Sequence, residues 1–301
     1  MNESKNDKSV EFLCSTKIGK IFLEFILFIR IPKLIGFFLR SPLSHFMISR
    51  FIKKNEIDMS EFEGQKYLSF NDFFTRRKEI SFDSEKTHLI SPCDSLLSVY
   101  SIKTNSTFHI KGFDYSLSDF FETSDSELLN TFKNGLCLVF RLCATDYHRY
   151  HYIDDGFQTE NHYIEGSLYS VQPAACENFK VYTKNRRSWT LLKTENFGTV
   201  AQVEIGAFSV GGICNHNENY AFKKGDEKGY FDLHGSTIVL IFEEDKIELL
   251  PEILKIAGNS EEIRVKAGEF IGKKSGKPNC LALPLSILFK TQIFNTFCLF
   301  F

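Results

Sequence analysis

The strongest constraint on the fold is the run STIVLIF at residues 236–242. Its last five residues are all aliphatic or aromatic, the run is short, and turn residues flank it. Uninterrupted apolar runs of this length are typical of strands that are buried on both faces. The sequence therefore predicts a core strand here.

A glycine and two hydroxyl residues, Gly235, Ser236 and Thr237, lead into this strand. The simpler interpretation is a tight turn, in which Gly235 adopts a positive φ and the hydroxyls bond loose backbone groups. The alternative is that Ser236 is a nucleophile held at a strained peptide bond. The local pattern leaves both interpretations open.

The composition argues against a disordered chain. With 301 residues and 43% hydrophobic side chains, the chain can bury a full core. Its eight cysteines are scattered without a CxxC pair, and the sequence has no pattern of a cleavable signal peptide. We therefore expect mostly buried free thiols and a reducing compartment.

The N-terminal part of the chain is both basic and apolar. Residues 15–54 contain eight Lys or Arg residues against one acid, a net charge of +7 that leaves −9 for the rest of the chain. Because charges at Glu24, Arg30 and Lys33 interrupt the apolar runs, no segment offers the roughly 18 clean apolar residues of a spanning helix. The pattern predicts amphipathic helices in the membrane interface, with their cations toward anionic headgroups.

Two other interpretations of this segment stay open. The helices could pack on the protein's own core, because an amphipathic pattern does not identify the partner of the apolar face. Nucleic-acid binding fits less well, since the cations alternate with Ile, Leu and Phe rather than with polar and stacking residues.

Beyond residue 60 the sequence predicts a β-rich domain. One helix is expected at residues 116–132, where Ser and Asp residues offer caps. Short strands are expected in SLLSVYSI (95–102), LCLVFRLC (136–143), GSLYSV (166–171), FKVYTK (179–184), TVAQVEIGAFSVGGI (199–213), STIVLIF (236–242) and EIRVKAG (262–268). The predicted fold class is α+β, with membrane-facing amphipathic helices at 1–60 before a domain of antiparallel sheets at 61–301.

Three segments carry the residue types that nucleophilic catalysis needs. An acid orients an imidazole, the imidazole takes a hydroxyl proton, and the oxygen attacks. The candidates are Asp94 in SPCDS (91–95), His148 and His151 in DYHRYH (146–151), and Ser236.

Each candidate also has a simpler interpretation. Asp94 follows a proline turn and could be an ordinary turn residue. His148 and His151, with Cys143 nearby, have the spacing of metal ligands. No third and fourth ligand form a recognisable cluster, so we predict no metal.

A longer series of motifs distinguishes these interpretations. In chain order the sequence contains FNDFFTRR (70–77), SPCDS (91–95), DYHRYH (146–151), GSLYSVQP (166–173), NRR (185–187), EIGAFSVGGI (204–213) and KKGDEKGYFDLHGST (223–237). This series closely resembles the phosphatidylserine decarboxylase family, from about residue 65 to residue 272.

The resemblance implies a self-processing proenzyme. Ser236 is expected to attack the carbonyl of Gly235, and rearrangement, elimination and hydrolysis then leave a pyruvoyl group, the self-derived covalent cofactor. The cut gives a large chain of residues 1–235 and a small chain of residues 236–301. The pyruvoyl would form a Schiff base with the amine of phosphatidylserine and act as an electron sink while CO2 leaves, giving phosphatidylethanolamine.

The resemblance also implies roles for single residues. Asp94, His151 and Ser236 match the charge-relay set for self-cleavage, with His151 as the base and Asp94 as its orienter. His148 matches the first histidine of the family motif, and we expect it to position the substrate and deliver a proton.

Other implied contacts are less specific. Arg76, Asn185 and Arg187 are candidates for contact with the lipid phosphate and, equally, for structural ion pairs and turns. The predicted partners are phosphatidylserine, an anionic membrane surface and the two chains of one precursor, with no nucleic acid and with a homo-oligomer left open. The predicted location is peripheral, on the cytoplasmic side of the cell membrane.

Three features depart from the family pattern. His234 stands where Leu or Gly is usual, and we expect it to alter the rate of cleavage rather than abolish it. Ser95 stands where glycine is common. The apolar tail at 280–301, which Pro284 and Lys290 argue against as a spanning helix, has no predicted role.

Rival function classes predict an intact chain. A serine hydrolase would use the same three residues on an external ester, and an inactive membrane-bound scaffold would use none. A pyruvoyl enzyme for a soluble amino acid shares the chemistry, but the basic apolar front argues against it. Because the relay candidates all lie beyond residue 60, we expect a chain that starts near Ser60 to keep whatever self-cleavage it can fold to perform. We expect it to lose turnover of bilayer-embedded phosphatidylserine far more than turnover of a short-chain, water-soluble analogue.

Overall fold

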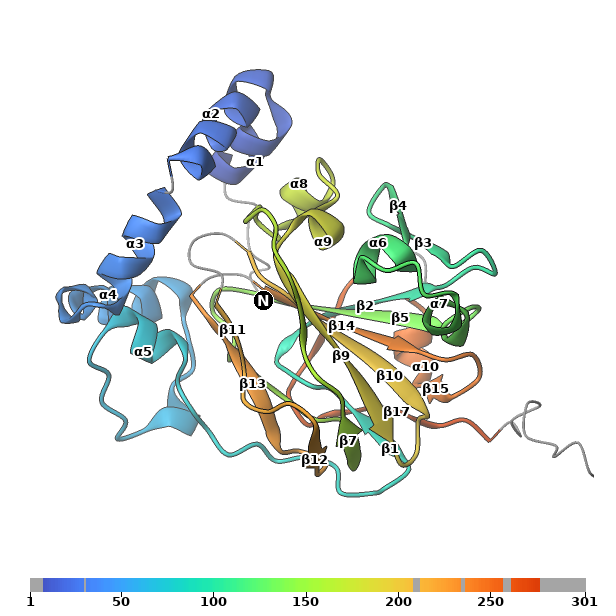
Figure 1. The fold of residues 1–301 in the computed structure, drawn as a ribbon. Helices are drawn as coiled ribbons and strands as arrows, with labels where there is room; N and C mark the ends of the chain where they lie inside the picture. Colours follow the sequence, from blue (N-terminus) through green and yellow to red (C-terminus); the bar gives the residue numbers. More distant parts are fainter. Residues whose placement is uncertain (1–7, 30, 208–211, 234–235, 257–260, 277–301) are drawn as a thin grey trace, which may run out of the picture.

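The computed structural model describes residues 8–29, 31–207, 212–233, 236–256 and 261–276 (Figure 1). At its centre is a nine-stranded antiparallel sheet. Its order is β12 (Tyr220–Phe222), β7 (Gly156–Gln158), β9 (Arg187–Thr194), β10 (Thr199–Ile205), β14 (Ser236–Phe242), β5 (Leu136–Leu142), β2 (Ser95–Ser101) and β16 (Ile263–Val265), with β8 (His162–Ile164) also paired to β9.

Smaller antiparallel sheets lie around this centre. Their strands are β11 (Gly212–Asn215), β13 (Glu227–Asp232) and β6 (Arg149–His151) in one, β1 (His88–Ile90), β17 (Phe270–Lys274) and β15 (Ile247–Leu249) in a second, and the pair β3 (Thr107–Ile110) and β4 (Phe113–Ser116). The predicted β-rich core of antiparallel sheets is confirmed.

The core strand β14 is buried on both faces, as the sequence predicts. Val239 and Ile241 join a cluster that includes side chains of the helices over one face of the sheet. Ile238 and Leu240 join a second cluster on the other face, with side chains of β6, β13 and β17. Because side chains alternate along a strand, Ser236 shares the face of Ile238 and Leu240, the side of the small sheets.

The helices are short, and most are N-terminal. They are α1 (Lys8–Ser15), α2 (Lys17–Phe28), α3 (Ile31–Arg40), η1 (Pro42–Ser44), α4 (Phe46–Asn55), η2 (Ser60–Phe62), α5 (Phe70–Phe74), α6 (Leu117–Phe121), α7 (Ser126–Thr131), α8 (Pro173–Cys176), α9 (Val181–Lys184) and α10 (Pro251–Leu254). Among the described residues, none of the helices combines the length and hydropathy needed to cross a bilayer.

The N-terminal helices pack on the domain with one face each. Cys14 of α1 and Leu23 of α2 join the core cluster on the helical side of the sheet. Leu39 of α3 and Ile48 of α4 join a separate cluster with α5 and Leu233. The interpretation that these helices pack on the protein's own core therefore holds for their inner faces.

The predicted helix at 116–132 is two short helices. Ser116 caps α6, which ends at Glu122 with a left-handed backbone, and Asp125 caps α7. The break follows from the local sequence, since Thr123, Ser124 and Asp125 favour turns and a new N-cap over a continuing helix.

Two predicted strands are wrong, and the side chain of Asn185 accounts for the first of them. Residues 166–171 form no strand, and residues 179–184 contain helix α9. Buried Asn185 accepts a hydrogen bond from the Tyr169 amide at 3.0 Å and donates to the Tyr169 and Gly206 carbonyls at 2.8 and 2.9 Å. The backbone groups of Tyr169 thus bond to a side chain instead of to a neighbouring strand, so residues 166–171 pack without joining a sheet.

A buried ion pair joins the central sheet to the small sheet beside it. Lys228 Nζ of β13 lies 2.9 Å from Glu204 Oε1 of β10, and neither side chain is exposed. Asn215 Oδ1 accepts a second bond from Lys228 at 2.9 Å, and Tyr150 also donates to it. Burial lowers the pKa of Lys228, and Glu204 offsets part of that effect.

We expect Lys228→Met to destabilise the fold by about 3–5 kcal/mol, because it leaves Glu204 buried without its cation. The measurement is urea unfolding in a Ser236→Ala background, so that a single uncut chain is compared. Adding Glu204→Leu should restore much of the loss. Lys223→Met, which removes an exposed pair with Asp155, is the control and should leave the unfolding midpoint nearly unchanged. An equal loss in both variants would contradict the argument.

Candidate active site

Ser236 and Asp94 lie at strand ends on the same side of the central sheet, and His151 ends β6 in the small sheet beside it. Ser236 begins β14 and lies opposite Leu142, the last residue of β5. β2 pairs with β5 on its other side and begins at Ser95, directly after Asp94. The antiparallel order thus brings the start of β14, the end of β5 and the start of β2 to the same edge.

Ser236 is buried, and its backbone entry is unusual. The side chain is 1% exposed, and its Oγ has no hydrogen-bond partner among the described residues. Leu233, three residues earlier, has a φ of +51°, a conformation that residues with a Cβ rarely adopt. Functional sites often contain a buried hydroxyl without a hydrogen-bond partner, and often contain a residue with a strained backbone, as Ser236 and Leu233 are here.

His151 is held as a neutral imidazole with its Nε2 unprotonated. Nδ1 donates to the Gly225 carbonyl at 3.0 Å, so the proton of the neutral ring is on Nδ1. Burial lowers the pKa of His151, and the Gly225 carbonyl and the charges of Glu227 and Asp94 offset part of the effect. Nε2 is buried without a hydrogen-bond partner among the described residues. The ring is therefore prepared to accept a proton.

Asp94 lies near His151 but bonds other groups. Its Oδ1 accepts from the Ala267 amide at 2.8 Å, and its Oδ2 lies 3.7 Å from Lys78 Nζ. The loop before Asp94 contacts His151 directly, since the His151 amide donates to the Pro92 carbonyl at 2.9 Å. Gly225 thus accepts the hydrogen bond that orients the imidazole, and Asp94 acts on His151 through its charge.

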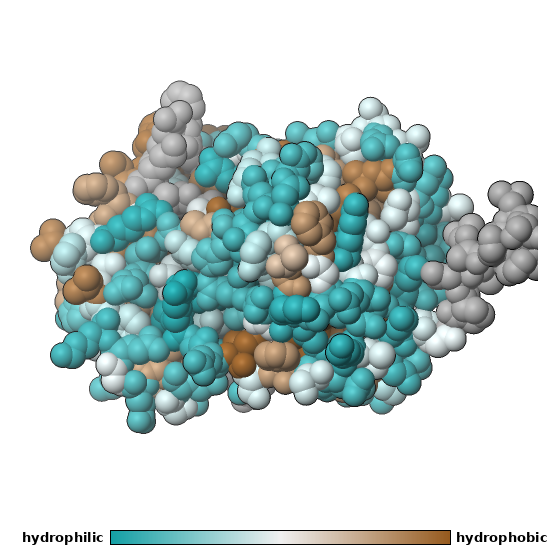
Figure 2. Space-filling view, turned by 60° about the horizontal axis from the view of Figure 1, so that its bottom comes forward, coloured by the Kyte–Doolittle hydropathy of each residue, from teal (hydrophilic) through white to brown (hydrophobic). Residues whose placement is uncertain are grey.

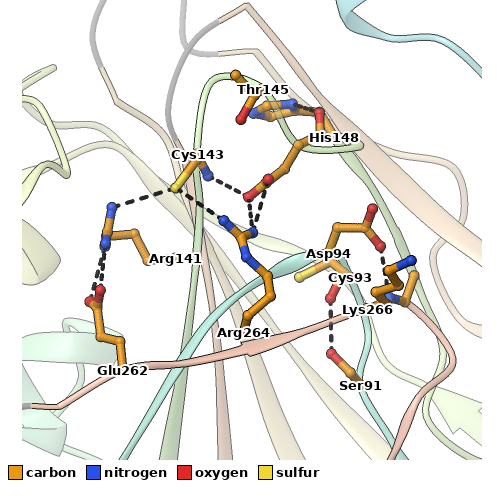
Figure 3. A network of polar contacts seen from close by, with 12 residues as sticks. Ser91, Cys93, Asp94, Arg141, Cys143, Thr145, His148, Glu262, Arg264 and Lys266 are labelled. Carbon is orange, nitrogen blue, oxygen red and sulfur yellow. Dashed lines mark hydrogen bonds and ion pairs between the residues drawn. The ribbon is translucent and has the colours of Figure 1, made fainter. Parts of the chain in front are cut away.

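His148 is fully buried and fixed by backbone contacts. Nδ1 donates to the Asp146 carbonyl at 2.9 Å, and the ring lies against Phe74 with centroids 3.9 Å apart. Asp146 is itself anchored, because its carboxylate accepts two bonds from Arg264 at 2.9 Å and one from the Cys143 amide at 2.7 Å (Figure 3). Arg264 lies after the predicted cut and His148 before it, so this network would join the two chains.

Cys143 lies in a cationic environment rather than in a metal site. Its Sγ is 3.9 Å from guanidinium nitrogens of both Arg141 and Arg264 (Figure 3). Burial and Asp146 nevertheless raise the pKa of the Cys143 thiol, so it stays protonated. Within the described ranges no cluster of His, Cys, Asp and Glu could hold a metal ion.

Arg76 is buried and bonded to backbone. It donates to the Phe73, Thr145 and Asp146 carbonyls at 3.4, 3.0 and 3.3 Å. Its guanidinium also stacks on the ring of Phe62, 4.8 Å from the centroid. These contacts make Arg76 a support for the loop that carries His148.

Asn185 and Arg187 also bond mostly to backbone. Arg187 is 1% exposed and donates to the carbonyls of Phe120, Thr183, Asn185 and Asp119, with Glu122 as its ion-pair partner. The same guanidinium and amide groups are therefore committed to the fold. Contact of either residue with a lipid phosphate stays a prediction.

Comparison with known proteins identifies the class. The profile of the family described as phosphatidylserine decarboxylase matches residues 70–273. The chain is 43% identical to phosphatidylserine decarboxylase proenzyme 2 of Clostridium acetobutylicum over 88% of this chain and 91% of that protein. It is 40% identical to the proenzyme of Clostridium beijerinckii over 89% and 93% of the two chains.

The chain therefore belongs to the phosphatidylserine decarboxylase family. It is a carboxy-lyase, and its reaction converts phosphatidylserine to phosphatidylethanolamine and CO2.

The sequence interpretation did not include several residues of the site. The Gly225 carbonyl has no side-chain signal, and Arg264 stands in a segment predicted only as a strand. Lys78 directly follows the FNDFFTRR motif at 70–77, and no other feature of the sequence indicates a role for it. The place of each of these three residues in the site depends on contacts between segments that are distant in sequence.

The rate of self-cleavage should be independent of pH between about 7 and 8 and should fall below about pH 6. The base form of His151 dominates above its pKa, which burial holds below the ordinary value of about 6.5. The measurement is the conversion of precursor, made in a short cell-free pulse and chased at set pH, on denaturing gels. An inflection at or above pH 7 would contradict the lowered pKa.

Proposed function

We propose that the chain matures by cutting itself between Gly235 and Ser236, with His151 as the base. His151 Nε2 takes the proton of Ser236 Oγ, and the oxygen attacks the Gly235 carbonyl carbon. The amide becomes an ester and the Ser236 nitrogen becomes a free amine. Elimination then frees the Gly235 carboxylate and leaves dehydroalanine, which water hydrolyses to the pyruvoyl group with release of ammonia. The observation that carries the proposal is the pair of buried atoms, Ser236 Oγ and His151 Nε2, which lack hydrogen-bond partners among the described residues.

The charges around His151 support this role. A buried cation is costly, so the imidazole is neutral before the attack and must be stabilised once it gains a proton. The carboxylates of Asp94 and Glu227 supply that stabilisation through their charge. The Gly225 carbonyl keeps the Nδ1 proton in place, so that only Nε2 accepts.

The residues fit a pyruvoyl group derived from Ser236. The side chain is enclosed, and β14 holds its backbone in a ladder on both sides. Such a group would supply an electrophilic carbonyl for the substrate amine and a sink for the electrons released with CO2. The enclosure shields that carbonyl from bulk solvent.

We assign the later proton transfer to His148. Its buried ring has a fixed tautomer, since the Asp146 carbonyl holds the Nδ1 proton. Nε2 is then the atom that accepts and returns a proton. Phe74 fixes the plane of the ring.

The substrate is a membrane lipid, and we propose that the outer faces of α2 and α3 lie in the membrane interface. Ile18 is 75% exposed and Phe37 is 78% exposed. Figure 2 shows hydrophobic residues projecting at the left edge, the side where Figure 1 draws the N-terminal helices, while most of that face is hydrophilic. The net charge of +7 over residues 15–54 suits anionic headgroups.

The purified protein should consist of two chains, residues 1–235 and 236–301. Intact mass under denaturing conditions measures this, and the small chain should resist Edman sequencing because a pyruvoyl end has no amine. Ser236→Ala should leave one full-length chain. Cleavage that persists in this variant would eliminate the mechanism, and labelling of an intact chain by a fluorophosphonate would favour the hydrolase.

Substitutions of the two histidines should impair different steps. His148→Ala should still cut itself but should decarboxylate poorly, by about 10²–10⁴-fold, the usual contribution of a positioned acid or base. His151→Ala should remain a precursor. Gel analysis of maturation and CO2 release from mature protein check the two steps, and equal loss of cleavage in both variants would refute this division.

Binding to vesicles of phosphatidylglycerol should be only partly reversed by high salt. Cations contribute about 1 kcal/mol each near an anionic surface, and buried apolar side chains add a share that salt does not screen. Detergent should give full release. Phe37→Ser should weaken binding in a flotation assay, whereas Phe157→Ser, an exposed phenylalanine on β7, should not. Equal binding by the two variants would place the lipid contact elsewhere.

A further inference from the structure

Helix α3 contacts the two residues that precede His234 and the cleavage site. Its last residue, Arg40, forms an ion pair with Asp232. Leu39, one residue earlier, is 4% exposed and belongs to the same buried cluster as Leu233. Nearly 200 residues of sequence separate the helix from these partners, so the contact is made only by the tertiary fold.

Leu233 needs this support. A left-handed backbone is strained for a residue with a Cβ, and such residues persist where their surroundings hold them. The side chain of Leu233 is fully buried in the cluster formed by α3, α4 and α5. Packing of this side chain therefore offsets the strain of its backbone.

Asp232 is fixed on two sides. Gly212 of β11 lies opposite it in the ladder, and a Cβ at Gly212 would come within 2.8 Å of the Asp232 Cβ. On the other side, its Oδ2 meets the Arg40 guanidinium. β11 and α3 thus hold the end of β13 between them.

We propose that Leu39 and Arg40 are positioning residues for self-cleavage. They fix the backbone of Asp232 and Leu233, the residues that lead to the bond between Gly235 and Ser236. The inference rests on the proposed self-cleavage. It also revises the expectation that a chain starting at residue 60 retains this activity, since that chain lacks the parts of α3 and α4 that surround Leu233.

The test compares the same substitution at a buried and an exposed leucine. Leu39→Ala removes a side chain from the inner face of α3, whereas Leu254→Ala removes a side chain of α10 that is 48% exposed. Precursor made in a cell-free pulse with detergent is chased well below its melting temperature and resolved on denaturing gels. We expect Leu39→Ala to slow cleavage about tenfold, equivalent to about 1.4 kcal/mol, and Leu254→Ala to cleave at the wild-type rate.

Three further measurements separate positioning from general stability. Melting temperatures of Leu39→Ala and Leu254→Ala in the Ser236→Ala background show whether the precursor is folded at the chase temperature. Leu233→Gly accepts the left-handed backbone without strain but lacks the packing side chain, so it should also cleave slowly. Arg40→Gln should slow cleavage and Arg40→Lys should restore part of the rate, with Arg186→Gln, which removes an ion pair with the exposed Glu165, as the control.

The outcomes distinguish the two proposals. A wild-type chain that stays uncut would overturn the proposed function, and this inference with it. Wild-type cleavage with equal rates in folded Leu39→Ala, Leu254→Ala and Leu233→Gly would overturn the inference alone.

Discussion

Burial of β14 between β10 and β5 is the constraint on which the rest of the structure depends. The strand is paired along its whole length on both sides and covered by apolar clusters on both faces. Ser236, its first residue, is therefore placed by a strand that is buried and paired on both sides. A cut directly before Ser236 would leave the new chain end held by a double ladder rather than released.

Burial stabilises the sheet, and it also determines which groups near Ser236 are charged. Removal from water keeps His151 neutral and gives the nearby carboxylates a stronger effect on it than they would have in solvent. Charges that must persist there are paired, as Arg264 is with Asp146. That pair crosses the proposed cut, so part of the order around His148 depends on the small chain staying in place.

The core strand, the helical front and the strands at 95–101, 136–142 and 199–205 could be predicted, because their patterns are local. The motif series named Ser236 and Asp94 as candidates, and in the fold these two residues lie at the same end of the central sheet. The strand β9 was missed, since RSWTLLKT mixes polar and apolar residues on a strand that is mostly buried. The hydrogen bond from His151 to Gly225 and the contact of Leu39 with the Leu233 cluster involve distant segments, which local patterns do not encode.

Helix α3 has one face that packs on the domain and one face that is exposed. Pro32, Gly36 and Leu39 are buried at helical spacing, while Leu34 and Phe37 are exposed on the other side. At ten residues it is too short to be stable alone in water, so its inner packing around Leu233 is what forms it. A bilayer that moved the outer face of α3 would therefore also move the support of Leu233, which ties lipid contact to the geometry of the cleavage segment.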